Sequence, residues 1–285
     1  MQRLFVFAIA LAALLAGSQP TIAREFRDII ASGELRVAIA AENILPWVGR
    51  GENDELLGFE VDIATKFAED LGVKVKFIER PFADLIPSLM AEEADVIISA
   101  LSITPERARR IMYSRPYGQS DLELVVSKGE LPEGAEEQSY DLPGMKIAVM
   151  RATTAELEGR SRFPESEIVA FDDFADARDA FLAAEVNAII APKPYPAFIQ
   201  MHDLENFVVV GDALSSTVEA MGIHPDNQRL LNYADSWIYD AMASGFLEAA
   251  TSHWFESIDW IEQVPALAEY MESLTAEEPS ESTGN

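Results

Sequence analysis

A short polar segment at residues 100–107, ALSITPER, carries side chains suited to binding a carboxylate. Thr104 and Pro105 are typical of a helix N-terminus, where they would be the N-cap and the first helical residue. The free N–H groups of such a terminus, the Ser102 hydroxyl and the Arg107 guanidinium could together hold an anion. Arginine suits a carboxylate because it donates two parallel charge-assisted hydrogen bonds, each contributing about 1.5–3 kcal/mol. The alternative is that Arg107 is an ordinary surface arginine, and the pattern alone leaves both interpretations open.

The elements before this segment predict where it lies in the fold. Short apolar runs alternate with helical patterns from Leu35 onward, and Phe59, Ile63 and Phe67 mark a helix by their four-residue spacing. The pattern predicts strands at 35–40, 73–78 and 94–101, with helices at 58–72 and 85–90. This order is typical of an α/β fold with a mostly parallel sheet. In such sheets ligands bind beyond the carboxyl ends of the strands, where the polar segment is expected.

The same alternation recurs in the second half of the chain. We expect strands at 146–150, 167–171 and 186–191, helices at 153–159, 172–185 and 227–244, and one more helix at 266–274. Asp172 is the expected cap of the second helix. Residues 129–144 are rich in Glu, Gly and Pro, and we expect them to form a linker or exposed loop between the two units.

The N-terminal residues predict export. A basic Arg3, an apolar run over residues 4–17 and small residues before Arg24 form the three parts of a signal peptide, with cleavage expected after Ala23. The run is shorter than the roughly 20 residues that span a bilayer, which argues against a membrane anchor. We therefore expect a periplasmic, free and soluble mature protein. The sequence contains no cysteine, which excludes disulfides, thiolate metal sites and cysteine nucleophiles.

The charge balance narrows the class of partner. The chain has 49 acidic and 21 basic residues, for a net charge of −28. Such a chain repels nucleic acid and anionic lipid surfaces. A heavily solvated surface explains the excess of acid, and steering of a cation is the alternative. The three histidines have no metal-ligand spacing, and no nucleotide-binding or hydrolase fingerprint is present. We expect neither cofactor nor metal.

One region of the chain resembles a known family. The stretches GFEVDIATKFAEDLG (58–72) and RPFADLIPSLMAEEADVIISALSITPERARRIMYSRPY (80–117), and more weakly LPGMKIAVMRATT (142–154), are similar to the amino-acid-type bacterial extracellular solute-binding proteins. These proteins are periplasmic receptors of ABC importers. The resemblance implies two α/β lobes that close on a ligand and are joined by two hinge strands, near 118–122 and 216–220.

The resemblance also implies domain boundaries. Residues 24–120 and 218–262 would form lobe 1, and residues 121–217 would form lobe 2. The remaining residues, 263–285, would be an acidic and partly disordered tail, since the last eleven lack large apolar side chains.

The resemblance assigns roles to individual residues of the site. Arg107 matches the arginine that pairs with the ligand α-carboxylate. Ser102 matches a hydroxyl in the same subsite, and Ala100 matches a position whose backbone carbonyl accepts from the ligand ammonium. Thr153 and Thr154 match a pair of donors in the second lobe. Phe82 matches an apolar wall residue, and Trp47 an aromatic beside the site. Ala152 stands before the threonine pair, where the family has glycine, which could alter how closely the backbone approaches the ligand.

The ammonium end of the site departs from the family. Pro192 and Ala41 stand where the family has its two acids, and Ile44 stands at the position of its stacking aromatic. Burying an ammonium without a carboxylate is costly, so these changes argue against an ordinary α-amino acid. Glu42 could substitute for the lost acid, or it could be a solvated loop residue.

Two basic residues near the predicted site leave another alternative open. Arg151 and Lys193 could add positive charge and favour a di-acid or an amine-free acid. They could equally be ordinary surface residues.

The sequence thus predicts a binding protein and no enzyme. We expect a monomer that captures a small carboxylate-bearing solute and docks on an ABC permease in the inner membrane. Periplasmic dehydratases that act on prephenate or arogenate resemble the same family and are one alternative. An accessory binding partner of a periplasmic dehydrogenase is another.

Overall fold

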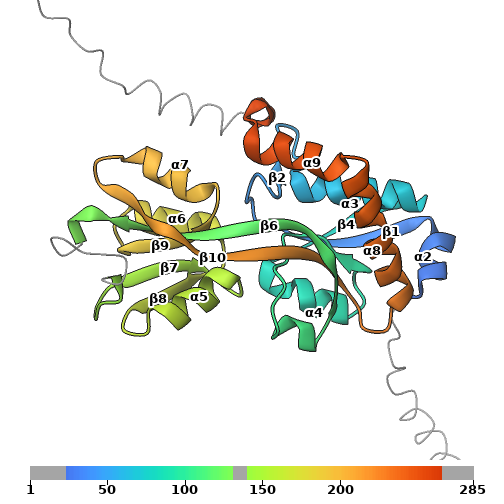
Figure 1. The fold of residues 1–285 in the computed structure, drawn as a ribbon, viewed down its shortest axis with the longest axis horizontal. Coiled ribbons are helices and arrows are strands. Elements are labelled where there is room, and N and C mark those ends of the chain that lie inside the picture. Colours follow the sequence, from blue (N-terminus) through green and yellow to red (C-terminus); the bar gives the residue numbers. More distant parts are fainter. Residues whose placement is uncertain (1–23, 131–139, 265–285) are drawn as a thin grey trace, which may run out of the picture.

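The computed structural model describes residues 24–130 and 140–264 (Figure 1). The predicted signal peptide, the predicted helix at 266–274 and the tail from residue 265 lie outside the described residues. None of the described helices is both long and apolar enough to cross a membrane.

One eight-stranded sheet runs through the whole molecule, in the order β4-β1-β5-β10-β6-β9-β7-β8. Three parallel strands form each end, and two long antiparallel strands lie between them (Figure 1). The strands at one end are β1 (Glu34–Ala40), β4 (Lys74–Arg80) and β5 (Val96–Ile97); those at the other are β7 (Lys146–Met150), β8 (Glu167–Phe171) and β9 (Ala188–Pro192). The central pair is β6 (Met112–Ser127) and β10 (Phe207–Ile223), and β2 (Gly49–Arg50) and β3 (Leu56–Leu57) form a separate small sheet.

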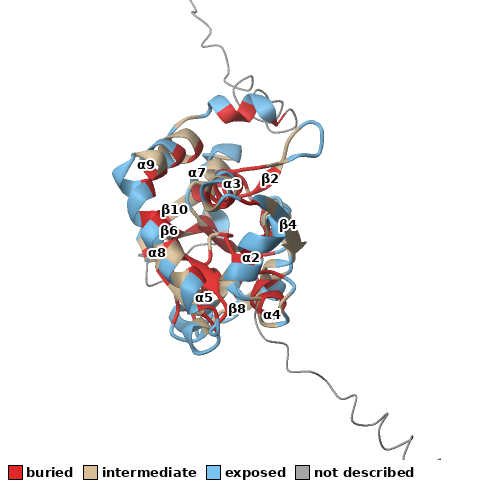
Figure 2. Cartoon of the chain, turned by 90° about the vertical axis from the view of Figure 1, so that its right-hand side faces the viewer, coloured by how far each residue is buried: buried red, intermediate tan, exposed pale blue. Residues whose placement is uncertain are grey.

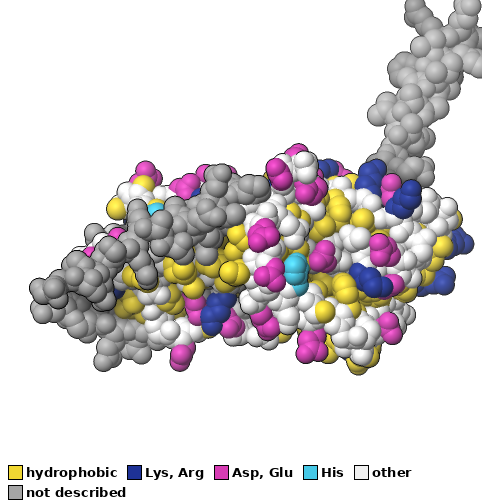
Figure 3. All heavy atoms as spheres, turned by 90° about the horizontal axis from the view of Figure 1, so that it is seen from above, with side chains coloured by type: hydrophobic (Ala, Val, Ile, Leu, Met, Phe, Trp, Pro, Cys, Tyr) yellow, Lys and Arg dark blue, Asp and Glu magenta, His cyan; other side chains and the backbone are white. Residues whose placement is uncertain are grey.

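Helices cover the sheet at both ends, so the described chain is a two-lobed α/β protein. The first lobe carries α2 (Phe26–Ser32), α3 (Phe59–Leu71), α4 (Leu85–Met90), α8 (Gln228–Ala243) and α9 (Phe246–Thr251); the second carries α5 (Thr154–Arg162), α6 (Phe174–Leu182) and α7 (Tyr195–His202). In the view along the long axis, buried residues lie inside and the outer helix faces are exposed (Figure 2). Acidic side chains are spread over the face drawn in Figure 3, and this distribution supports a solvated surface.

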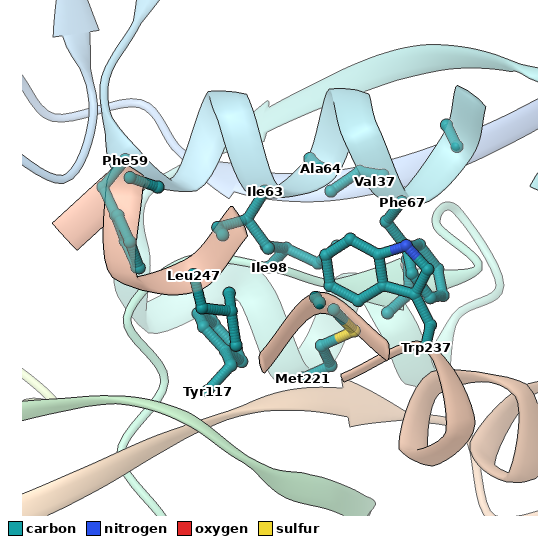
Figure 4. Close-up of a cluster of buried hydrophobic side chains, with 14 of the residues drawn as sticks. Val37, Phe59, Ile63, Ala64, Phe67, Ile98, Tyr117, Met221, Trp237 and Leu247 are labelled. Atoms are coloured by element: carbon teal, nitrogen blue, oxygen red, sulfur yellow. The ribbon is translucent and has the colours of Figure 1, made fainter. Parts of the chain in front are cut away.

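The predicted helix at 58–72 is observed as α3. Gly72 ends it in the left-handed conformation, with φ at 80°, which glycine adopts without strain. Its apolar face packs against α8, where the Phe67 and Trp237 rings meet edge to face with centroids 5.2 Å apart (Figure 4). Phe59 and Phe67 are fully buried, and each such side chain stabilises the fold by about 1.5–3 kcal/mol.

The inter-lobe connection differs from one expectation. The chain crosses between the lobes within β6 and returns within β10, so residues 129–144 are not the connection between the lobes; within that expected linker or exposed loop, residues 131–139 lie outside the described residues. The crossings agree with the positions 118–122 and 216–220 that the family resemblance implied. β6 is a continuous strand because its backbone groups pair with β10 on one side and with β9 on the other.

Three local predictions also need correction. The strand predicted at 94–101 shortens to β5, because beyond it the Ala40 N–H bonds the Ser99 hydroxyl at 2.9 Å. The cap of α6 is Asp173 and not its neighbour, since the extended backbone of Asp173 directs its carboxylate to the Ala175 N–H at 2.7 Å. The helix expected from Pro105 is a single 3₁₀ turn at Arg107–Arg109.

Candidate ligand-binding site

A cavity lies between the two lobes, and the space free of protein atoms in it and at its mouth is about 700 Å³. Its lining comes from the ends of β1, β7 and β9, from the segment after β5 and from the central strands. The residues that line it include most of the predicted site: Trp47, Phe82, Ala100, Ser102, Arg107, Thr153 and Thr154. The cleft is closed in this structure, since contacts join the two lobes around it.

Arg107 reaches across the cleft. Its guanidinium donates through Nη1 to the Ser102 carbonyl at 2.9 Å and through Nη2 to the Ala152 carbonyl in the other lobe at 2.8 Å. The Arg107 N–H also donates to the Thr104 hydroxyl at 3.2 Å, although the residue at the cap position of the 3₁₀ turn is Glu106 and not the predicted Thr104. The turn thus holds the arginine between the lobes.

The charge of Arg107 lacks a counter-ion. No carboxylate among the described residues forms an ion pair with it, while one face of the guanidinium lies 5.4 Å from the centre of the Phe82 ring. Burial lowers the pKa of Arg107 from its ordinary value because the desolvated cation is disfavoured. A guanidinium in this situation gains most from a carboxylate supplied by a ligand.

The second lobe presents hydroxyls and helix amides to the same cavity. Thr153 precedes α5 and Thr154 is its first residue, so both lie at a helix N-terminus. The Thr153 hydroxyl donates to the Met150 carbonyl at 2.6 Å, which fixes the turn between β7 and α5. This arrangement can stabilise negative charge opposite Arg107.

The alanine that precedes the threonine pair has a strained backbone. Ala152 has φ at 60°, in the left-handed region that favours glycine. We expect Ala152→Gly to raise the free energy of unfolding by about 1 kcal/mol, because glycine removes the strain. Urea denaturation would measure this. Ala197→Gly, in the exposed face of α7, is the matched control and should lower stability by about 0.5–1 kcal/mol. A loss for both variants would contradict the argument.

Aromatic and apolar side chains close the cavity on one side. Trp47 is 3% exposed, stacks on Tyr195 of the second lobe with ring centroids 6.4 Å apart, and meets Phe255 edge to face. Ile44 and Phe82 pack against the core of the second lobe. These contacts exclude water, which strengthens any polar contact made inside.

The positions where the family acids are missing remain without a carboxylate. Pro192 and Ile44 both line the cavity, and Ala41 is exposed. Glu42 is buried and accepts a hydrogen bond from the Phe82 N–H at 2.8 Å, so its interpretation as a solvated loop residue is wrong. Glu42 does not line the cavity, however, and burial raises its pKa.

The two extra basic residues lie outside the cavity lining. Arg151 pairs with Asp172 at 2.6 Å, and Lys193 pairs with Glu123 at 3.0 Å. Both cations are half-exposed and already neutralised, which favours their interpretation as surface residues.

One carboxyl in the cavity wall was missed from the sequence. Glu219, on β10, is 2% exposed and lines the cavity, and its backbone forms a bridge with Ser102. The only sequence signal was an acid at an inward-facing position of a predicted hinge strand. Glu60, at the start of α3, is fully buried close by and accepts a hydrogen bond from the Tyr117 hydroxyl at 2.6 Å.

Metal or catalytic groupings are not found among the residues that the structure describes. No set of three histidine, aspartate or glutamate side chains there is placed to hold a metal ion. His224 is buried beside Asp226, while His202 is exposed and His253 half-buried. The tryptophans 237, 254 and 260 are core residues.

Comparison with known proteins identifies similar chains. The family model of the bacterial extracellular solute-binding proteins, family 3, matches residues 35–257. The L-cystine-binding protein of Escherichia coli (strain K12) is 26% identical over 210 residues, covering 74% of this chain and 78% of the relative. Cyclohexadienyl dehydratase of Pseudomonas aeruginosa is 26% identical over 263 residues, covering 89% and 95%.

Solved structures are similar over most of the chain. An ancestral amino-acid-binding protein, described as a precursor of cyclohexadienyl dehydratase, superposes with a TM-score of 0.72 at 26% identity, covering 80% of this chain and 98% of that one. An ancestral arginine-binding protein bound to arginine gives a TM-score of 0.69 at 26% identity, covering 78% and 98%.

Proposed function

Since the chain belongs to the bacterial extracellular solute-binding proteins of family 3, we propose that it is the periplasmic solute receptor of an ABC importer. It captures a small carboxylate-bearing solute between its lobes and delivers it to an inner-membrane permease. Relatives that bind cystine and arginine support an amino acid or a derivative as the solute. The signal peptide at 1–23 delivers the protein, which acts as a monomer and needs no cofactor.

A single observation supports this proposal most strongly. Arg107 holds a desolvated positive charge in an enclosed cavity and has no acidic partner among the described residues. Ser102, Thr153 and Thr154 line the same space. Together these groups favour a bound carboxylate, and binding requires no covalent step.

The lobes have defined roles in this proposal. Residues 24–120 and 218–262 form the first lobe and residues 121–217 the second, with β6 and β10 as the hinge. The contacts of Arg107 with Ala152 and of Trp47 with Tyr195 would open in the solute-free form.

We expect one class of solute to bind tightly in isothermal titration against amino acids, keto acids and dicarboxylates. The Kd for the best ligand should be about 1 μM or lower, which corresponds to roughly −8 kcal/mol. Refolded protein should be used, because a ligand retained from the host would block the site. The absence of binding to every carboxylate in the panel would contradict the proposal.

A dehydratase of the cyclohexadienyl type is the second candidate. It is favoured by a relative of that name and by the buried carboxyl of Glu219 in the cavity wall, which could serve as an acid. Incubation with prephenate or arogenate, followed by detection of the aromatic product, would distinguish the dehydratase from the solute receptor. Turnover would establish the enzyme, whereas stoichiometric binding without turnover supports the receptor.

A further inference from the structure

We propose that Glu219, supported by Glu60, forms a cation-binding end of the cavity, so that the solute carries an amino group as well as a carboxylate and its binding releases a proton. This inference rests on the proposed function and narrows its substrate class. Glu219 does not stand at position 41 or 192, where the resemblance places the family's two ammonium-binding acids, so the assignment follows from the structure of this chain.

Glu219 is a buried acid in the cavity wall. It is 2% exposed and lines the cavity wall, and no ion pair to its carboxyl is found among the described residues. The Trp47 indole N–H faces it and favours its ionised form, but the contact does not reach hydrogen-bond geometry. Gly118 makes room for the carboxyl, because a Cβ there would lie 2.7 Å from Glu219 Oε2.

The position of Glu219 suits a solute whose carboxylate and ammonium are attached to the same carbon. Ser102 pairs with Glu219 in the backbone bridge, and the carbonyl of Ser102 accepts from Arg107. An acid and an arginine therefore flank a single residue of the cavity wall. An α-amino acid places its carboxylate and ammonium on one carbon, so it fits two such groups.

Among the described residues, a second acid lies near Glu219 and no unpaired cation does. Glu60 lies close enough for the two carboxyls to interact, and the Tyr117 hydroxyl donates a hydrogen bond to Glu60 at 2.6 Å. Lys193 and Asp121 line a neighbouring cavity that Glu219 also borders, but this lysine is paired with acids at the hinge. Burial is the main cause that raises the pKa of both Glu60 and Glu219, and their mutual repulsion adds to it at Glu219.

The neighbours of this carboxyl pair, Trp47, Tyr117 and Ser102, all belong to the first lobe, so opening of the lobes keeps them together. The pair therefore holds a proton when the cavity contains no cation. An entering ammonium replaces that proton as the partner of the carboxylate: Glu219–COOH and R–NH₃⁺ give Glu219–COO⁻···⁺H₃N–R and a free H⁺. The charge in the buried site is unchanged by this exchange, which avoids the cost of burying an unpaired ion.

Titration calorimetry in two buffers of different ionisation enthalpy tests the inference. The probes are the L-amino acids and L-cystine, with the Nα-acetyl derivative of each compound that binds. We expect about 0.5–1 proton to be released per bound amine near neutral pH, and the acetyl derivatives to bind at least about 10-fold more weakly. Equal affinity for an amine-free acid, or no proton release, would overturn the inference.

Substitutions test whether Glu219 is the group that binds the amine and releases the proton. Glu219→Gln should weaken binding of the amine about 10- to 100-fold and abolish proton release, whereas Asp121→Asn, another hinge carboxyl, should change the affinity less than about threefold. Gly118→Ala leaves both acids in place but displaces the Glu219 carboxyl, so it should weaken binding in the same direction. Melting curves confirm folding. Parent-like binding by both site variants overturns the inference, while loss of binding in Arg107→Ala would still support the proposed function.

Discussion

We expect Arg107→Ala to weaken solute binding by at least about 100-fold, because it removes a two-pronged, charge-assisted contact from an enclosed site. The guanidinium is held in place by the Ser102 and Ala152 carbonyls and needs little reorganisation to accept a carboxylate. The variant also loses a bond between the lobes, which reduces the stability of the closed form. Isothermal titration with the best ligand of the panel measures the loss.

Two further substitutions define what Arg107, the proposed anchor of the solute carboxylate, contributes to binding. Arg107→Lys keeps the charge but loses the planar fork, so its affinity should fall about 10-fold or more. Arg109→Ala, in the same turn and exposed, is the matched control and should bind like the parent. If Arg107→Ala binds as tightly as this control, Arg107 is not the anchor.

Much of the fold was predictable because its signals are local. The four-residue spacing of Phe59, Ile63 and Phe67 specified α3, and the apolar runs at β7 and β8 gave the bounds that the structure has. Composition did not predict which segment connects the two lobes. Residues 129–144 have the composition of a linker, yet β6 crosses as a regular strand because its pairing partners come from distant parts of the chain.

The carboxylate end of the site was predictable for a related reason. Arg107, Ser102 and Thr104 lie in one short segment, so their proximity follows from the chain itself. Glu219 comes from a strand more than a hundred residues away, and only sheet pairing brings it next to Ser102. The raised pKa of Glu219 depends on its burial. A single acid in an alternating strand pattern does not show from the sequence whether it is buried.

The buried acids also predict how stability depends on pH. We expect the solute-free protein to lose stability as the pH rises above about 4.5, the ordinary pKa of a glutamate. Burial raises the pKa of Glu60 and Glu219 in the folded state, so the folded chain keeps protons that the unfolded chain releases. Each retained proton lowers the free energy of unfolding by about 1.4 kcal/mol per pH unit, until the pH passes the folded pKa.

Urea denaturation at pH 5, 6 and 7 measures this slope. Below about pH 4.5 the sign reverses, because acids with lowered pKa, such as Asp70 beside Lys66, lose their stabilising contacts on protonation. Glu219→Gln should reduce the slope between pH 5 and 7 by up to about 1.4 kcal/mol per unit, since one retained proton is removed. Glu248→Gln, in the exposed face of α9, should leave the slope unchanged. If the slope of the unfolding free energy against pH is the same in Glu219→Gln as in the parent, Glu219 is already ionised in the folded protein. It then has no proton to exchange for an ammonium, and the inference is contradicted.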